Sequence, residues 1–131
     1  VHRGPAVSPP DDSESGAWQF YLHPHQDDNL LASSGGRTFC LVNLDWDQPL
    51  HVVRLDEGGD ILNIPRGTFH RSLSDLDGSV VLNQAIRNPG GCIEKEFRVY
   101  NSLKIPKLYQ VISKAAGDLH VLRPETFFQV A

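Results

Sequence analysis

Three histidines at two places in the chain have the residue type and spacing of a metal site. His23 and His25 are two residues apart in the segment Tyr21-Leu22-His23-Pro24-His25, so on a strand both imidazoles would project from the same face. His70 lies far along the chain, directly after a turn sequence. Three converging neutral imidazoles suit a divalent transition metal such as Zn, Fe, Mn, Ni or Cu and leave positions open for a substrate or water.

The turn before His70 is encoded in the stretch from Gly59 to His70, GDILNIPRGTFH. Its apolar residues predict a short strand that runs into a Pro-Arg-Gly turn. Pro65 presets φ, and Gly67 supplies a backbone conformation that a residue with a Cβ resists. The sequence therefore predicts a tight turn that aims His70 at a defined place.

The spacing of these residues resembles the two sequence motifs of the cupin family. The second motif is matched by Gly59, Pro65, Gly67 and His70, and the first by Gly16, His23-Pro24-His25 and Gly36. The likeness covers residues 16–74. It implies a single-domain antiparallel β-barrel of the jelly-roll type, whose mouth holds a metal between the histidines.

The chain departs from the cupin pattern at the acidic ligand. Where cupins usually supply a carboxylate before the closing glycine, this chain has Asn29, and Ser74 stands where the second motif often has asparagine. Asp27 or Asp28 could take over from a neighbouring position. We therefore name five candidate metal ligands: His23, His25, His70, Asp28 and Asn29.

A metal-free reaction draws on the same segment. The chain is similar in outline to nucleotide-sugar epimerases and ketoisomerases of the cupin superfamily, in which a pocket histidine acts as base and a tyrosine as acid. Period-two alternation places Tyr21 on the face of His23 and His25, so the candidate catalytic residues are Tyr21, His25 and His70. A phosphate or carboxylate could be held by an arginine, for which the candidates are Arg37, Arg66 and Arg71.

The elements that must position these residues are short strands separated by turn sequences. Strands are predicted at residues 17–25, 37–45, 50–55, 61–64, 68–73 and 79–86, with a tight hairpin at Gly35-Gly36 and a turn at residues 74–78. Weaker patterns predict strands at 97–100 and 119–122 and a helix at 106–116. This order predicts an all-β fold, an antiparallel barrel with a C-terminal helix.

Composition sets the domain organisation and the partners. The 131 residues suffice for one domain; we expect residues 1–15 to be a flexible segment and residues 16–131 to form the cupin-like domain. The net charge of −4 without a basic stripe argues against nucleic acid as a partner, and no apolar run reaches the roughly 20 residues of a membrane span.

Two cysteines without a pairing motif and no secretory signal predict a cytoplasmic protein. Open barrel edges predict a homodimer.

Together these observations predict a small-molecule enzyme, metal-dependent in the first hypothesis. Its substrate would be a sugar or a small carbonyl or carboxylate metabolite, and its reaction an isomerisation, an epimerisation or that of a dioxygenase. The alternative is a non-catalytic binding module for a sugar or small acid, with or without metal.

Overall fold

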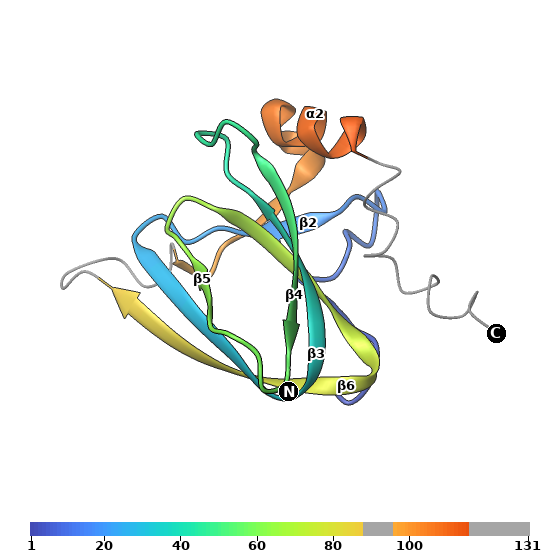
Figure 1. The fold of residues 1–131 in the computed structure, drawn as a ribbon. Coiled ribbons are helices and arrows are strands. Elements are labelled where there is room, and N and C mark those ends of the chain that lie inside the picture. The colour runs from blue at the N-terminus through green and yellow to red at the C-terminus, as the bar shows by residue number, and fades with distance from the viewer. Residues whose placement is uncertain (88–95, 116–131) are drawn as a thin grey trace.

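The computed structural model describes residues 1–87 and 96–115 (Figure 1). Its elements are β1 (Val7–Ser8), β2 (Gln19–Tyr21), β3 (Gln26–Val42), β4 (Leu50–Asp56), β5 (Leu62–Ile64), β6 (Phe69–Arg87), β7 (Val99–Asn101), the 3-10 turn η1 (Ser102–Lys104) and helix α2 (Pro106–Lys114). The predicted C-terminal helix is confirmed and begins at a proline, as expected for a first helical turn. The strand predicted at 119–122 lies outside the described residues.

The sheet is antiparallel and is built around β3 and β6. Its strands follow the order β4-β3-β6-β2-β7, with β1 on β6 and β5 on β3. The predicted hairpin between residues 37–45 and 50–55 is confirmed, because β4 pairs with β3 from Gly36↔Asp56 to Val42↔Leu50. Within the described residues the backbone pairing does not close into a complete ring. The predicted antiparallel fold with a C-terminal helix is therefore present as an open barrel.

Two predicted turns are wrong. Residues Gly35-Gly36 do not make a hairpin and residues 74–78 do not end a strand, since β3 and β6 run through both places and pair with each other along most of their length. The register shifts beside Gly35 instead. Gly35 has a φ of 67°, and a Cβ there would lie 2.3 Å from the carbonyl oxygen of Gly78. The glycines thus allow the long pair of strands β3 and β6 to bend where their backbones approach closely.

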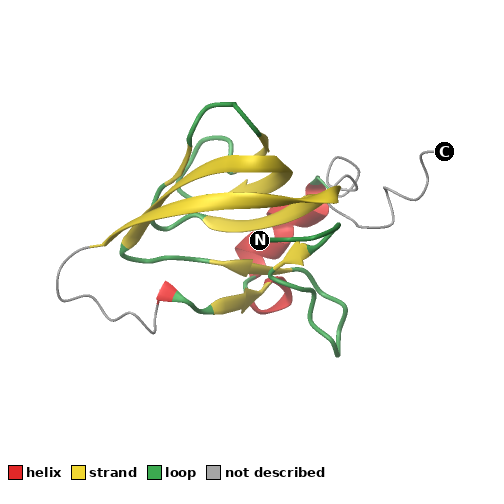
Figure 2. Cartoon of the chain, turned by 90° about the horizontal axis from the view of Figure 1, so that it is seen from below, coloured by secondary structure: helices red, strands yellow, loops and turns green. Residues whose placement is uncertain are grey.

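The two faces of this bent pair carry separate apolar clusters. One cluster lies between the sheet and α2 and consists of Phe20, Cys40, Val42, Phe69, Leu73 and Leu108. The other lies on the opposite face and consists of Leu30, Ala32, Phe39, Leu41, Leu55 and Ile64. Alternating residues of β3 supply both clusters, as period-two geometry requires. Helix α2 covers only the first face (Figures 1 and 2), so the second face is left to line a pocket.

The N-terminal segment, which the sequence predicts to be flexible, runs along β6. Its strand β1 pairs with β6 at Val7↔Leu73, and the backbone of His2 exchanges two hydrogen bonds of 2.8 Å with Ser79. This course places the first eight residues beside the pocket-lining face. Neither α2 nor any other helix in the described ranges has the length and apolar character of a membrane span.

Candidate metal centre

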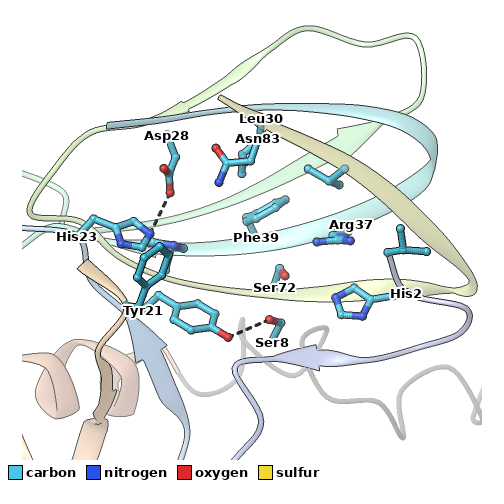
Figure 3. A pocket seen from close by; sticks show the side chains of 14 residues that line it. His2, Ser8, Tyr21, His23, Asp28, Leu30, Arg37, Phe39, Ser72 and Asn83 are labelled. Atoms are coloured by element: carbon cyan, nitrogen blue, oxygen red, sulfur yellow. Dashed lines mark hydrogen bonds and ion pairs between the residues drawn. The ribbon is translucent and has the colours of Figure 1, made fainter. Parts of the chain in front are cut away.

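Three buried side chains from separate parts of the fold converge on one point. His23 follows β2, Asp28 is on β3 and His70 is on β6, and their potential ligand atoms all lie within 4.8 Å of one another. The backbone pairing explains this convergence, because Tyr21 of β2 and Leu41 of β3 both pair with His70. Figure 3 shows His23 and Asp28 pointing toward each other across the pocket.

The turn predicted from the sequence aims His70. Gly67 has a φ of 79°, which favours glycine, and its amide donates to the carbonyl oxygen of His23 at 3.0 Å. The amide of Arg66 donates to the Asp27 carboxylate at 2.8 Å, and the Arg66 side chain pairs with the same group. The turn is therefore fixed against the segment that carries His23 and Asp28.

Backbone carbonyls set the orientation of both imidazoles. His70 Nδ1 donates to the carbonyl oxygen of Thr68 at 3.2 Å, and His23 Nδ1 donates to the carbonyl oxygen of Glu96. Each ring is thereby left with Nε2 for the cluster, and His23 Nε2 lies 3.0 Å from Asp28 Oδ2. Metal-binding histidines in proteins are usually held in this way by the second ring nitrogen.

The neutral ring of His70 and the ionised carboxylate of Asp28 suit a ligand set, whereas His23 must lose a proton before its Nε2 can bind a metal. Burial lowers the pKa of His70 to about 4, so this ring is neutral at neutral pH. Burial also acts to lower the pKa of His23, but the hydrogen bond and charge of Asp28 outweigh it and the pKa is raised. Burial opposes ionisation of Asp28, yet hydrogen bonds from His23 and Gln26 hold its pKa below the ordinary value.

Two imidazoles and one carboxylate are a donor set that fits a divalent transition metal. This combination with open positions is typical of non-haem Fe(II) sites, and Zn, Mn, Ni and Cu accept the same donors. Asp28 places in this cluster the carboxylate that Asn29 lacks.

The structure does not bring two of the five predicted ligands to the cluster. His25 is exposed, because β2 ends at Tyr21 and the chain bends at Pro24, so the alternation does not extend to His25; its amide donates to the Glu96 carboxylate at 3.0 Å. Asn29 faces away from the pocket and hydrogen-bonds the side chains of Gln84 and Asn63. The predicted catalytic residue Tyr21 does lie beside the cluster, with its ring centroid 5.8 Å from that of His70.

The cluster occupies one end of a pocket of about 340 Å³. Figure 3 shows Arg37 and His2 toward the other end, with Leu30 and Phe39 between. The Tyr21 hydroxyl lies 3.5 Å from Ser8 Oγ. The pocket lining also includes Val1, Ser72, Val81, Asn83 and Phe97.

Arg37 is the only one of the three candidate anion-binding arginines that lines this pocket. Its Nε donates to Ser79 Oγ at 2.6 Å, and no carboxylate in the described part of the chain forms an ion pair with it. Arg66 instead pairs with Asp27, and Arg71 is buried beneath Trp18 and pairs with Asp11. The half-burial of Arg37 lowers the pKa of its guanidinium, which remains cationic near neutral pH.

Sequence reasoning missed Glu96, Phe97 and Gln26. Glu96 is buried and holds His23 through its carbonyl oxygen and the His25 amide through its carboxylate. The Phe97 ring meets the His23 ring edge-on, with centroids 6.5 Å apart. Glu96 and Phe97 are far from His23 in sequence, so no local spacing could indicate their contacts with it. Gln26 is near His23 in sequence but is linked to Asp28 and Arg87 instead.

No family model matches the chain. A curated protein, the bifunctional lysine-specific demethylase and histidyl-hydroxylase NO66 of Drosophila mojavensis, is 40% identical over 58 residues. The match spans 44% of this chain and 6% of that protein, so the chain corresponds to a small part of the relative's length.

Among solved structures, two mutants of the oxalate decarboxylase of Bacillus subtilis align with 94% of this chain and 29% of their own, at TM-scores of 0.52 and 0.51 and 12% identity. These neighbours are cupins. The chain has a cupin fold. The RmlC epimerase of Mycobacterium tuberculosis aligns at a TM-score of 0.46, which is too low to bear on the reaction.

Proposed function

We propose that this cupin is a mononuclear metal enzyme that oxidises a small organic substrate with dioxygen. The observation that carries the proposal is the buried set of His23, Asp28 and His70 at the end of a pocket. Two histidines and one carboxylate with open positions are typical of Fe(II) oxygenases. The curated relative is named as a demethylase and a hydroxylase, and a hydroxylase inserts an oxygen atom, which agrees with this reaction class.

The residues of the pocket have separate roles in this proposal. His23, Asp28 and His70 hold the ion, which when bound supplies redox and Lewis-acid chemistry. Arg37 binds a carboxylate at the other end of the pocket through a charge-assisted hydrogen bond. The apolar side chains of Leu30, Phe39 and Val81 line the space between and limit the access of water.

The number of electrons that such a reaction consumes indicates what role the carboxylate bound by Arg37 has. Insertion of one atom of O₂ into a C–H bond, with the other atom leaving as water, takes up two further electrons and two protons. A co-substrate that is itself oxidised must supply these electrons. We propose that the small carboxylate anchored by Arg37 is this co-substrate, which is oxidised by two electrons as the substrate is hydroxylated.

The test is metal analysis of the purified protein, followed by titration with Fe(II) under anaerobic conditions. We expect one ion per chain, with binding lost in His70→Ala and retained in His51→Ala, which replaces an exposed histidine outside the pocket. Consumption of dioxygen that depends on Fe(II) and on an added small carboxylate would then identify the reaction class. A protein that binds no transition metal at micromolar concentration would contradict the proposal.

A metal-free acid–base enzyme is the second candidate, and the His23–Asp28 pair favours it. His23 Nε2 lies 3.0 Å from Asp28 Oδ2, an arrangement in which the carboxylate orients the imidazole and stabilises its protonated form. Tyr21 places a hydroxyl in the same pocket as a candidate acid. For this enzyme, solvent deuterium should enter a sugar substrate in the presence of a chelator. Undiminished exchange in Tyr21→Phe would remove this candidate.

A further inference from the structure

A buried amide lies directly behind the carboxylate of the metal centre. Residue Gln26 is 2% exposed, and its side-chain Nε2 donates to Asp28 Oδ1 at 2.6 Å. The other carboxylate oxygen, Oδ2, faces His23. The two oxygens of Asp28 are therefore not equivalent, since one is held by the amide and the other faces the cluster.

The orientation of this amide is set by Arg87. Arg87 Nε donates to Gln26 Oε1 at 2.5 Å. Because a guanidinium has donors only, it accepts no hydrogen bond from the amide nitrogen, and it selects the rotamer in which Gln26 Nε2 faces Asp28. In the opposite rotamer the amide oxygen would face the carboxylate, which repels it. Arg87 is at the end of β6, and its carbon Cζ lies 5.4 Å from the centre of the Phe97 ring.

The same group of side chains reaches both ends of the His23–Asp28 pair. Phe97 contacts Arg87 on one side and the edge of the His23 ring on the other. Gln26 contacts Arg87 and Asp28. Asp28 and His23 are thus supported by one connected set of contacts that begins at the exposed end of β6.

We infer that Gln26, oriented by Arg87, is a positioning residue that makes Asp28 a single-oxygen ligand. The hydrogen bond engages Oδ1 and keeps the carboxylate from turning both oxygens toward the ion, so more of the ion's coordination positions stay available to substrates. This inference rests on the metal centre proposed above. It assigns a role to two residues that lie outside the ligand set.

The experiment uses Co(II) as the probe, because its absorption spectrum reports the number and type of its ligands. Gln26→Met removes the amide donor at nearly constant shape. Its matched control is Gln84→Met, which removes an amide from the exposed face of β6, where it pairs with Asn29. Loss of a group that orients a metal ligand typically weakens metal affinity roughly 10- to 100-fold. We expect this loss, together with a changed spectrum, in Gln26→Met only.

Arg87→Met tests the orientation of the amide and can be measured even if Gln26→Met does not fold. Arg87 is exposed, so its replacement should leave the fold intact. We expect a smaller loss of Co(II) affinity and a spectrum shifted in the same direction as that of Gln26→Met, whereas Arg87→Lys, which keeps a donor, should lie nearer to wild type. If Gln26→Met does not fold, Arg87→Met decides the matter.

The outcomes separate this inference from the proposed function. Wild-type Co(II) affinity and spectrum in Gln26→Met would overturn the inference; if Gln26→Met does not fold, the same result in Arg87→Met would overturn it. Loss of Co(II) binding in Asp28→Asn would still support the metal centre. If the wild-type protein binds no Co(II), the metal centre itself fails. An equal loss in Gln26→Met and Gln84→Met would show a general effect on the strands and would also overturn the inference.

Discussion

Replacing Asp28 by asparagine should separate the stability of the fold from metal binding. In the metal-free protein Asp28 accepts hydrogen bonds from Gln26 and His23. An asparagine can still accept from Gln26 through its oxygen, and its amide nitrogen can donate to Nε2 of a neutral His23. The variant keeps both contacts but exchanges charged hydrogen bonds for neutral ones, which differ by about 1 kcal/mol each. We expect a loss of about 1–2 kcal/mol in the metal-free free energy of unfolding.

Metal binding should respond far more strongly, because Asp28 supplies the only anion of the ligand set. At a metal concentration of about 100 times Kd, binding stabilises the wild-type fold by about 2.7 kcal/mol. For a chain of this size that corresponds to a rise in Tm of roughly 8–12 °C. Asp28→Asn should show little or no rise under the same conditions.

The assay is thermal unfolding with chelator and with added Co(II), with affinities measured by isothermal titration calorimetry. Asp27→Asn is the matched control, since the Asp27 carboxylate pairs with Arg66 and is not part of the cluster. We expect this control to keep the metal-dependent rise. If Asp27→Asn loses the metal-dependent rise in Tm and Asp28→Asn keeps it, the assignment of Asp28 is refuted and the acidic ligand is Asp27.

Four further outcomes follow from the structure. His25→Ala should bind Co(II) as the wild type does, because His25 is exposed and outside the cluster; lost binding in this variant would return His25 to the ligand set. Arg37→Met should weaken binding of malonate, a simple dicarboxylate, by about 10-fold or more, as expected for one charge-assisted hydrogen bond, and Arg37→Lys by less; equal affinities in calorimetry would show that anions bind elsewhere. In Cys92→Ser, which leaves Cys40 as the only thiol, iodoacetamide should react only after unfolding, because burial raises the pKa of Cys40 to about 12; rapid alkylation of the native protein would contradict this burial. In the metal-free protein, burial lowers the pKa of His70 from 6.5 to about 4, so the stability that the neutral ring contributes is full above pH 6.5 and falls by about 3 kcal/mol at most as the pH drops toward 4. Urea titrations of His70→Asn should lack this part of the pH dependence. Identical pH profiles of the variant and the wild type would show that His70 is not buried in neutral form.

The parts of the fold that were predictable from sequence depend on local turn chemistry. Pro65 and Gly67 specify one turn through their own backbone preferences, and the position of His70 follows from it. The antiparallel strands and the helix that begins at Pro106 follow from periodicity and composition. These features need no knowledge of distant residues. The described residues contain the turn, antiparallel strands and the helix, while the strand predicted at 119–122 lies outside them.

The failures have physical reasons as well. Gly35-Gly36 has the composition of a hairpin turn, but the same lack of side chains permits a close approach to Gly78 within a continuous strand, and only the partner strand decides between the two. The alternation that placed His25 beside His23 assumes a straight strand, and Pro24 interrupts it. Glu96 contacts His23 across a large separation in sequence, which no local pattern indicates.

Strand β6 makes the chemistry of the pocket dependent on strand register. His70 and Ser72 line the pocket, while Phe69, Arg71 and Leu73 face away from it or lie in the cluster beneath α2. A slip of one residue would replace the neutral imidazole by a guanidinium, which repels cations. Gly78, whose Cβ would lie 2.2 Å from the carbonyl oxygen of His2, helps to exclude such a slip. Insertions and deletions between residues 70 and 80 should therefore be tolerated far less well than substitutions on the exposed face of the same strand.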